Sequence, residues 1–534
     1  MCGIAGIVGE QASEDLLNQL LLPIAHRGEI SYRDEKLVLS GMAIGTHRLA
    51  IVDEFSGKQP IQSEDKRVFC VFNGEIYNHI ELRRQLSLDK HFLSECDSEV
   101  VLRAYLKWGE KFVKHLDGKY GIAIFDKSKN VLILARDPMG IKPLYYGSFK
   151  NNWVFSSELK SLTTLQNELG NIIELAPGSI WKNGVCKPYF NLKNFSKQQV
   201  NDLPLLECSA KLKDCLIKAI RKRIPEGETK IACLLSGGVD SSIITYIARQ
   251  LHPKVVAYTL AAPHMPSADL TAARMLCEEF DIKHVIVSPP IQEMQQFYLE
   301  QGVYMTESFE PVLVRNAVSY HFLCRQVVAD GFKYCLNGEG ADELFGGYDF
   351  VREAPLHLQD DVIWHSLSII HKTYLQMADR ASMYTTLEAR VPYMDKDLVD
   401  FCLSLPPKAR VSGNDNKVLL RQTFKDELPE GIVNRRKTGM NEGAGFGVNA
   451  SRESIYHQAV KSYYENDPAK LEEDLELCQK VAIEGKIDLM EIEEVYNFSQ
   501  FVRLGYIKLT NSRSRLQLNT KLKQNLIQPL CEAV

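Results

Sequence analysis

The stretch Leu234-Leu235-Ser236-Gly237-Gly238-Val239-Asp240-Ser241-Ser242 follows an apolar run and precedes a helical pattern. Its two glycines permit a tight turn whose backbone N–H groups point inward. The start of the following helix adds partial positive charge. Together with the serine hydroxyls, these features predict a site for an anion such as pyrophosphate. Serine and aspartate are also common helix caps, so a turn before a capped helix is the alternative.

Strands and helices alternate around this stretch. Strand-like runs at residues 230–235, 254–262 and 283–288 are separated by amphipathic helical runs, and the pattern after residue 350 is mainly helical. Such alternation is typical of βαβ units and a parallel sheet. We therefore predict an α/β domain over residues 208–515, with a mainly helical C-terminal part, and a tail at 516–534.

The first 190 residues have a different pattern. Short strand-like runs lie at residues 42–53, 67–77, 120–137, 143–149 and 153–158, and the helical runs at 13–26 and 97–109 are few. This arrangement predicts an α+β sandwich over residues 2–190. The polar segment that follows contains a proline, so residues 191–207 are predicted to be a linker.

The composition limits the partners. The chain has 534 residues and a formal net charge of −5, without a long basic tract, so no nucleic-acid partner is expected. No run approaches the roughly 20 apolar residues of a membrane helix, and no membrane partner is expected. Thirteen scattered cysteines, without CxxC pairs, indicate free thiols in a reducing compartment. The start lacks a secretory signal pattern, so we expect a cytoplasmic protein.

A second glycine-rich loop strengthens the nucleotide hypothesis. Residues 337–348 read NGEGADELFGGY and also follow an apolar, strand-like run. Carboxylates beside a phosphate loop suit Mg²⁺, which prefers carboxylate, water and phosphate oxygens. Asp240 and Asp342 form the natural pair of ligands. An acidic, solvated turn is the alternative, but two such loops at strand ends favour a nucleotide crevice.

These motifs resemble a known enzyme family. SGGVDSS resembles the pyrophosphate loop of N-type ATP pyrophosphatases, and GEGADELFGGY resembles the matching loop of glutamine-dependent asparagine synthetases. The start, Cys2-Gly3-Ile4-Ala5-Gly6, resembles that of class II, N-terminal-nucleophile glutamine amidotransferases. Further matches in the same order are HRG at 26–28, HRLAIVD at 47–53, FNGEIYN at 72–78, ARDPMGIKPLY at 135–145, SSELK at 156–160 and LEARVPYMD at 387–395.

For the N-terminal domain the resemblance implies a glutaminase with an αββα Ntn-hydrolase sandwich. Removal of Met1 would leave Cys2 as a nucleophile whose own α-amine serves as general base. Asn73 and the Gly74 N–H would form the oxyanion hole. The glutamine-binding residues implied by the resemblance are Arg48, Ile51, Glu75 and Asp97.

For the C-terminal domain the resemblance implies an ATP-pyrophosphatase fold that uses ATP and Mg²⁺. Asp240 and Asp342 would ligate the metal, and Lys417 would offset charge at the phosphates. Glu339 would lie near the acceptor or its adenylate, and Arg315 would bind the acceptor. The ATP-binding residues implied are Leu235, Ser236, Gly237, Gly238, Asp240, Ser241 and Gly338.

The implied reaction converts aspartate, glutamine and ATP to asparagine, glutamate, AMP and pyrophosphate, through a β-aspartyl-AMP intermediate. Two departures stand out: Gly28-Glu29 replaces the usual Gly-Pro, and Val312 and Leu313 replace a usual threonine pair. Apolar side chains cannot hydrogen-bond a carboxylate. Amidation of another carboxylate, such as a specialised metabolite, a sugar acid or a carrier-bound acid, is therefore the alternative. A non-catalytic nucleotide-binding homologue is a third hypothesis. A homodimer is left open.

Overall fold

The computed structural model describes residues 2–29, 35–51, 53, 56–86, 92–165, 169–192, 204–447, 454–485 and 492–506. The described residues divide into two compact units. The first holds the chain up to Asn191, together with Met383–Thr386 and the residues from Arg503; the second holds Leu192–Ser382 and Leu387–Val502. The predicted tail at 516–534, and most of the predicted linker at 191–207, lie outside the described residues.

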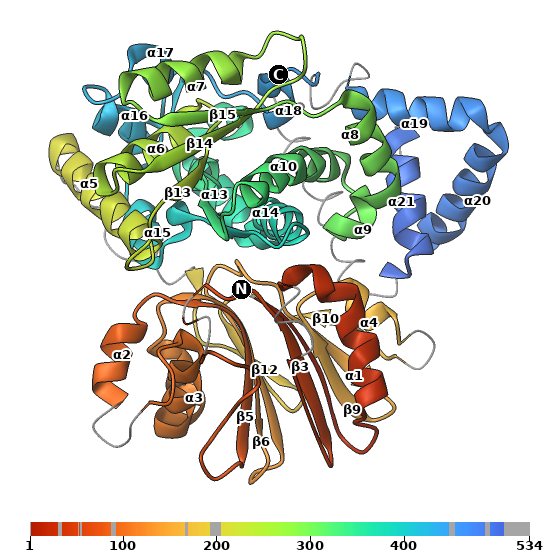
Figure 1. Ribbon diagram of the computed structural model, residues 1–534. Coiled ribbons are helices and arrows are strands. Elements are labelled where there is room, and N and C mark those ends of the chain that lie inside the picture. The colour runs from red at the N-terminus through yellow and green to blue at the C-terminus, as the bar shows by residue number, and fades with distance from the viewer. Residues whose placement is uncertain are drawn as a thin grey trace. The chain divides into compact units, whose positions relative to one another are not determined.

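The first unit contains two six-stranded antiparallel sheets (Figure 1). In spatial order, one consists of β10 (Ile173–Glu174), β8 (Tyr145–Phe149), β9 (Asn152–Ser156), β1 (Cys2–Val8), β3 (Met42–Arg48) and β2 (Glu35–Leu39). The other consists of β12 (Val185–Pro188), β11 (Ser179–Lys182), β7 (Val131–Arg136), β6 (Gly118–Asp126), β5 (Val68–Ile76) and β4 (Ile61–Gln62). The strand-like runs predicted from the sequence overlap β3 and β5 to β9.

Side-chain alternation explains how these sheets stack, because successive residues of a strand face opposite sides. Val71 of β5 packs in the core between the two sheets with Ile4 and Ile44, and its neighbour Phe72 packs in the core that covers the opposite face. That second core is closed by α2 (His79–Leu86) and α3 (Asp97–Trp108). On the other sheet lie α1 (Glu14–Leu21) and α4 (Leu159–Thr163), which completes a helix–sheet–sheet–helix order (Figure 1).

The second unit is built on a five-stranded sheet in which every neighbouring pair is parallel. Its spatial order is β15 (Lys283–Val287), β14 (Val255–Leu260), β13 (Ile231–Leu234), β16 (Tyr334–Leu336) and β17 (Glu388–Arg390). The chain adds β14 and β15 on one side of β13, and then β16 and β17 on the other. The carboxyl ends of β13 and β16 thus border the point where the winding reverses, where open parallel sheets bind ligands.

Helices surround this sheet and predominate among the described residues beyond residue 350, as predicted (Figure 1). The exceptions among the described residues are β17 and the short pair β18 (Val411–Ser412) and β19 (Asp415–Asn416). The helices are α5 (Leu205–Lys222), α6 (Val239–Leu251), α7 (Ala268–Glu279), α8 (Ile291–Phe297), α9 (Val303–Thr306), α10 (Pro311–Ala329), α11 (Ala341–Phe345), α12 (Asp349–Glu353), α13 (Gln359–Ile369), α14 (Tyr374–Met383), α15 (Lys396–Leu403), α16 (Val418–Phe424), α17 (Glu430–Val433), α18 (Met440–Ala444), α19 (Ile455–Asn466), α20 (Pro468–Gly485) and α21 (Ile492–Arg503).

Helix α5 begins at Leu205, inside the predicted linker, because the extended Pro204 precedes it and fixes where the helix starts. Within the described part of the chain, no helix combines the length and the apolar character that crossing a membrane requires. The cysteines of the same residues are all free thiols, in agreement with their scattered spacing.

Candidate active sites

The thiol of Cys2 lies at the first position of β1, opposite Arg48 of β3 in the antiparallel register. Its side chain is buried, with 4% of its surface exposed. The backbone nitrogen of Cys2 donates a hydrogen bond to Oδ1 of Asn73 at 3.1 Å. The edge where β1, β3 and β5 meet therefore holds a buried thiol beside a side-chain amide.

Asn73 presents a donor that nothing in the described residues accepts. Its side chain is fully buried, and its Nδ2 atom has no hydrogen-bond partner there. A buried donor without a partner costs free energy, so such a group marks a place where a ligand oxygen fits. The next residue, Gly74, lies so close to β6 that an added Cβ would sit 2.1 Å from the Lys119 carbonyl oxygen. Glycine is thus required there by the packing of the two strands.

Gln59 supports this arrangement and was not among the residues singled out from the sequence. Its Nε2 donates to the Phe72 carbonyl at 3.1 Å, and its Oε1 accepts from the Phe72 N–H at 2.7 Å. The same Nε2 lies 3.6 Å from the Cys2 Sγ. One side chain therefore fixes β5 just before Asn73 and contacts the thiol. Gln59 carries no motif signal, since its role depends on a fold that brings a loop to β5.

The charged groups predicted to bind glutamine are also buried. Arg48 has its Nε 3.4 Å from Oε1 of Glu35, and Glu35 accepts the Gln59 N–H through its other oxygen at 3.0 Å. Asp97, at the start of α3, accepts the Ile76 N–H at 2.8 Å, and burial raises the pKa of its carboxyl. Glu75 is buried and Ile51 is half-buried.

The backbone behind Cys2 is braced by an ion-pair cluster. Arg27 donates from Nε to the Cys2 carbonyl at 3.2 Å and from Nη1 to Glu158 at 2.5 Å. Lys160 pairs with the other oxygen of Glu158 at 2.6 Å. The departure at Gly28-Glu29 has a structural role: the Glu29 N–H donates to the Arg48 carbonyl at 3.0 Å, a bond that proline cannot make.

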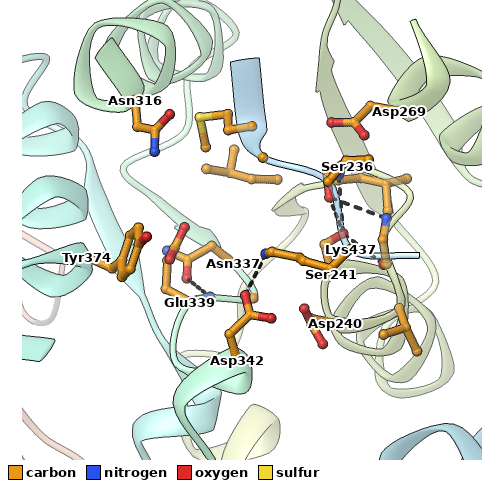
Figure 2. A pocket seen from close by; sticks show the side chains of 18 of the residues that line it. Ser236, Asp240, Ser241, Asp269, Asn316, Asn337, Glu339, Asp342, Tyr374 and Lys437 are labelled. Atoms are coloured by element: carbon orange, nitrogen blue, oxygen red, sulfur yellow. Dashed lines mark hydrogen bonds and ion pairs between the residues drawn. The ribbon is translucent and has the colours of Figure 1, made fainter. Parts of the chain in front are cut away.

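A cavity of about 310 Å³ opens at the carboxyl ends of β13 and β16 in the second unit (Figure 2). The loop after β13 is tied by the Ser236 N–H, which donates to the Ser241 Oγ at 3.2 Å. Gly237 does not line the cavity; its φ of +70° and its approach to α7, where a Cβ would lie 2.5 Å from the Ala273 nitrogen, require glycine. Predicted residues that line the cavity are Leu235, Ser236, Gly238, Asp240, Ser241, Gly338, Glu339, Asp342 and Lys417.

The charges in this cavity form one cluster. The Lys417 Nζ lies 2.5 Å from a carboxylate oxygen of both Asp240 and Asp342. The Lys437 Nζ lies 2.5 Å from the second oxygen of Asp342 (Figure 2). Gly347 leaves the necessary space, because a Cβ there would lie 1.9 Å from Asp342 and 2.4 Å from Lys417. Segments far apart in the sequence, at residues 240, 342 and 417–437, thus supply the two cations and the two anions.

Burial and the two lysines shift the pKa values of Asp342 and Glu339 in opposite directions. Burial alone would raise the pKa of Asp342, but Lys417 and Lys437 hold that pKa well below its usual range. For Glu339, burial raises the pKa to about 8, together with repulsion from Glu343, Asp342 and Asp240, although Lys437 acts in the opposite direction. One carboxyl is therefore kept ionised and its neighbour is kept largely protonated at neutral pH.

Comparison with known proteins agrees with both units. The family model described as "Glutamine amidotransferase domain" matches residues 1–176, and the model described as "Asparagine synthase" matches residues 211–369 and 356–488. The nodule asparagine synthetase [glutamine-hydrolyzing] of Pisum sativum is 30% identical over 479 residues, 84% of this chain and 79% of the relative. Asparagine synthetase 2 of Oryza sativa subsp. japonica is 31% identical over 477 residues, covering 84% and 78%.

The chain belongs to the glutamine-hydrolysing asparagine synthetase family. The relative from Sandersonia aurantiaca, also 31% identical, is covered over 87% of its length. The resemblance stated from the motifs is therefore confirmed.

In this member of the asparagine synthetase family, the acceptor side of the cavity departs from the sequence prediction. Arg315 does not line the cavity. Its Nε donates to Oε1 of Glu493 at 2.7 Å, and its Nη2 pairs with the other oxygen of that carboxylate. Both side chains are buried. The sequence could not show this pair, since Glu493 lies on α21, far along the chain from α10. Val312 does line the cavity, and Leu313 does not.

Two further residues of the cavity were missed. Lys437 and Arg435 lie between α17 and α18, and Arg435 donates to the Ser236 carbonyl at 2.9 Å and to Asp269 at 2.5 Å. The basic run Arg435-Arg436-Lys437 was the only available signal, and a basic run is more often solvated. Burial raises the pKa of Asp269 to about 6, and Arg435 opposes that rise.

Proposed function

We propose that this chain hydrolyses glutamine at Cys2 and uses ATP to convert a carboxylate to an amide, with aspartate as the acceptor that the family relation favours most directly. The products would be asparagine, glutamate, AMP and pyrophosphate. The observation that carries the proposal is the cluster of Asp240, Asp342, Lys417 and Lys437 in one cavity at the switch point of a parallel sheet. Paired carboxylates and lysines at this position suit a nucleoside triphosphate with its magnesium ion.

The glutaminase half of the proposal rests on Cys2 and Asn73. After removal of Met1, the atom that now donates to Asn73 Oδ1 would be the α-amine of Cys2, which can take the thiol proton. The thiolate sulfur would attack the glutamine amide carbon, and the carbonyl oxygen would accept the unpartnered Nδ2–H of Asn73 and the Gly74 N–H. The C–N bond would then break, and ammonia would leave with the proton that the α-amine had taken. Water would hydrolyse the resulting thioester, which releases glutamate and restores the thiol. Arg48 and Asp97, with Glu75 and Ile51, would hold the glutamine backbone groups.

The synthetase half rests on the cavity residues. A carboxylate oxygen of the acceptor would attack the α-phosphorus of ATP, and pyrophosphate would leave beside Lys417 and Lys437. Ammonia would then attack the acyl carbon, AMP would leave, and the nitrogen would lose one proton. Leu235, Gly237 and Gly238 would shape the nucleotide site, and the Ser236 and Ser241 hydroxyls would bond phosphate oxygens.

The residues present fit a magnesium ion. Oδ1 of Asp240 is buried and has no hydrogen-bond partner among the described residues, and its other oxygen shares the Lys417 ammonium with Asp342. Asp240 and Asp342 would hold the ion, with phosphate oxygens and water as the remaining ligands. When bound, it would offset the negative charge that develops on the departing pyrophosphate.

The alternative acceptor is favoured by a specific observation. Arg315 is bonded to Glu493 through Nε and Nη2 and does not line the cavity, and Val312 offers the cavity no hydroxyl. Another carboxylic acid, recognised by different contacts, is therefore the second candidate acceptor for the same reaction.

The proposal is tested with purified enzyme, ATP, Mg²⁺ and either glutamine or ammonium as nitrogen source. Cys2→Ala should abolish glutamine hydrolysis and leave ammonia-dependent AMP formation. Cys186→Ala, at an exposed cysteine, is the matched control and should leave both activities in place. Glutamine hydrolysis at the wild-type rate by Cys2→Ala would show that the glutaminase assignment is wrong.

A further inference from the structure

Asn316 carries an unpartnered amide donor on the wall of the nucleotide cavity. It lies on α10 and lines the cavity together with Val312, which is one helical turn earlier on the same face. Only 6% of its surface is exposed. Its Oδ1 accepts a hydrogen bond from the Asn441 Nδ2 at 2.9 Å, while its own Nδ2 bonds to none of the described residues. A buried donor of this kind marks a place where a ligand oxygen fits.

A chain of hydrogen bonds fixes the direction in which this amide faces. The Tyr456 hydroxyl, on α19, is fully buried, and its one partner among the described residues is the Ser319 Oγ, 2.8 Å away. A buried phenol O–H needs an acceptor, so Tyr456 donates to Ser319. The single Ser319 hydroxyl proton then goes to the Asn441 Oδ1, which leaves the Asn441 Nδ2 to donate to Asn316. The Nδ2 of Asn316 is therefore the atom that faces the cavity.

The position of Asn316 separates it from the groups proposed to hold the metal ion. Figure 2 shows its amide nitrogen directed into the cavity, on the side where Tyr374 lies and across the cavity from Asp240. The carboxylate that attacks the α-phosphorus has to lie near Asp240 and Asp342, because the metal ion would also bind the phosphate oxygens. A ligand group that bonds Asn316 is therefore a different part of the acceptor.

The chemistry of this donor selects the group that it binds. An amide N–H bonds a carboxylate oxygen, whereas an ammonium group has only donors and would find no acceptor at this nitrogen. The neighbouring Arg315 forms its ion pair with Glu493 and does not line the cavity. Near the start of α10, Asn316 rather than Arg315 thus supplies the cavity with a hydrogen-bond donor.

We propose that Asn316 recognises the non-reacting carboxylate of a dicarboxylic acceptor, and that Asn441, Ser319 and Tyr456 are positioning residues for its amide. This inference rests on the proposed function and names a residue that determines its substrate specificity. Aspartate has such a second carboxylate, on the carbon that bears its ammonium group. Because Asn316 contacts the acceptor and not the nucleotide, its removal should weaken the binding of the acceptor alone.

The test measures AMP release by the full-length enzyme with ATP, Mg²⁺ and ammonium, first with aspartate varied and then with ATP varied. Asn316→Ala should raise KM for aspartate about 10- to 100-fold, since one hydrogen bond to a charged group is lost. The values of kcat and of KM for ATP should change little. Asn316→Asp keeps the oxygen that Asn441 bonds but replaces the donor with a negative oxygen, so KM for aspartate should rise further. Asn466→Ala, at an exposed asparagine that ends α19, is the matched control.

Tyr456→Phe tests the positioning residues, because it removes only the hydroxyl that gives the hydrogen-bond chain its direction. It should raise KM for aspartate several-fold in the wild type and add nothing in Asn316→Ala. Loosening of the fold would instead add to the effect of Asn316→Ala. Tyr463→Phe makes the same change at a half-buried tyrosine of the same helix and is the control.

An unchanged KM for aspartate in Asn316→Ala would overturn the assignment. An equal rise in KM for ATP would overturn it as well, because the donor would then serve the nucleotide. So would a lower KM for aspartate in Asn316→Asp, because the side chain would then face the ammonium group. In each case AMP formation with aspartate would leave the proposed function in place. No AMP formation by the wild-type enzyme with any acid, aspartate included, would refute the proposed function itself.

Discussion

At the scale of single residues, the unpartnered donor of Asn73 is the most informative atom of the first unit. Asn73→Ala should lower the rate of glutamine hydrolysis about 100- to 1000-fold, because one oxyanion donor is lost. KM for glutamine should change much less than kcat, since the donor acts on charge that develops during reaction. Steady-state glutamate release measures both constants. Asn18→Ala, at an exposed asparagine, is the control. A loss confined to KM would contradict the oxyanion role.

His321 allows a prediction about pH. It stacks on Phe297 with centroids 4.3 Å apart, and burial, with the charge of Arg325, lowers the pKa of its imidazole to about 4. The unfolded chain takes up a proton near pH 6.5 and the folded chain only near pH 4, so this residue makes stability fall as pH falls between these values. The loss is roughly 2 to 3 kcal/mol. In His321→Gln, denaturant unfolding should show a correspondingly weaker dependence over that window. If the stability of His321→Gln depends on pH as strongly as that of the wild type, the lowered pKa of His321 is contradicted.

At the scale of elements, one buried ion pair joins α10 to α21. Arg315 and Glu493 come from helices that are far apart in sequence, and Tyr298 donates a further hydrogen bond to Glu493 at 2.5 Å. Removal of one partner leaves the other charged and buried, so Glu493→Ala should reduce the free energy of unfolding by about 3 to 5 kcal/mol. Guanidinium denaturation measures this loss.

The matched control is Glu472→Ala on α20, where the glutamate is exposed; its effect should stay within about 0.5 kcal/mol. Equal stability of the two variants would mean that the pair does not hold the helices together.

At the scale of the whole molecule, the two units carry two separate sets of reactive groups. A substitution in one set should therefore abolish one activity and leave the other in place. Asp342→Asn should abolish acceptor-dependent AMP formation, because the carboxylate that pairs Lys417 with Lys437 is lost. Glutamine hydrolysis should persist in that variant, because every group proposed for it lies in the other unit. Parallel assays of glutamate and AMP on each variant check this. Simultaneous loss of both activities, with circular dichroism unchanged, would refute the separation.

The sequence by itself determined the features that depend on short stretches. Strand–helix alternation predicted the parallel sheet, and the glycines and serines at 236–242 predicted the turn that places Asp240 at the end of β13. These are local matters of periodicity and turn conformation, which neighbouring residues specify. The second glycine-rich loop added Asp342, the family resemblance added Lys417, and the structure brings both to Asp240.

Only the tertiary structure decided which distant side chains meet. Lys437 forms an ion pair with Asp342, and Arg315 forms one with Glu493. Gln59 bonds to β5 and contacts the Cys2 thiol. Nothing in a single sequence marks these partners, because the contacts arise when separate elements pack, and a lysine or glutamate before packing resembles any solvated charge. A second cavity of the same unit, lined in part by Val312, Ile369, Tyr374 and Phe501, has the same origin. Its walls come from α10, α13, α14 and α21, so its shape exists only after four helices have packed together.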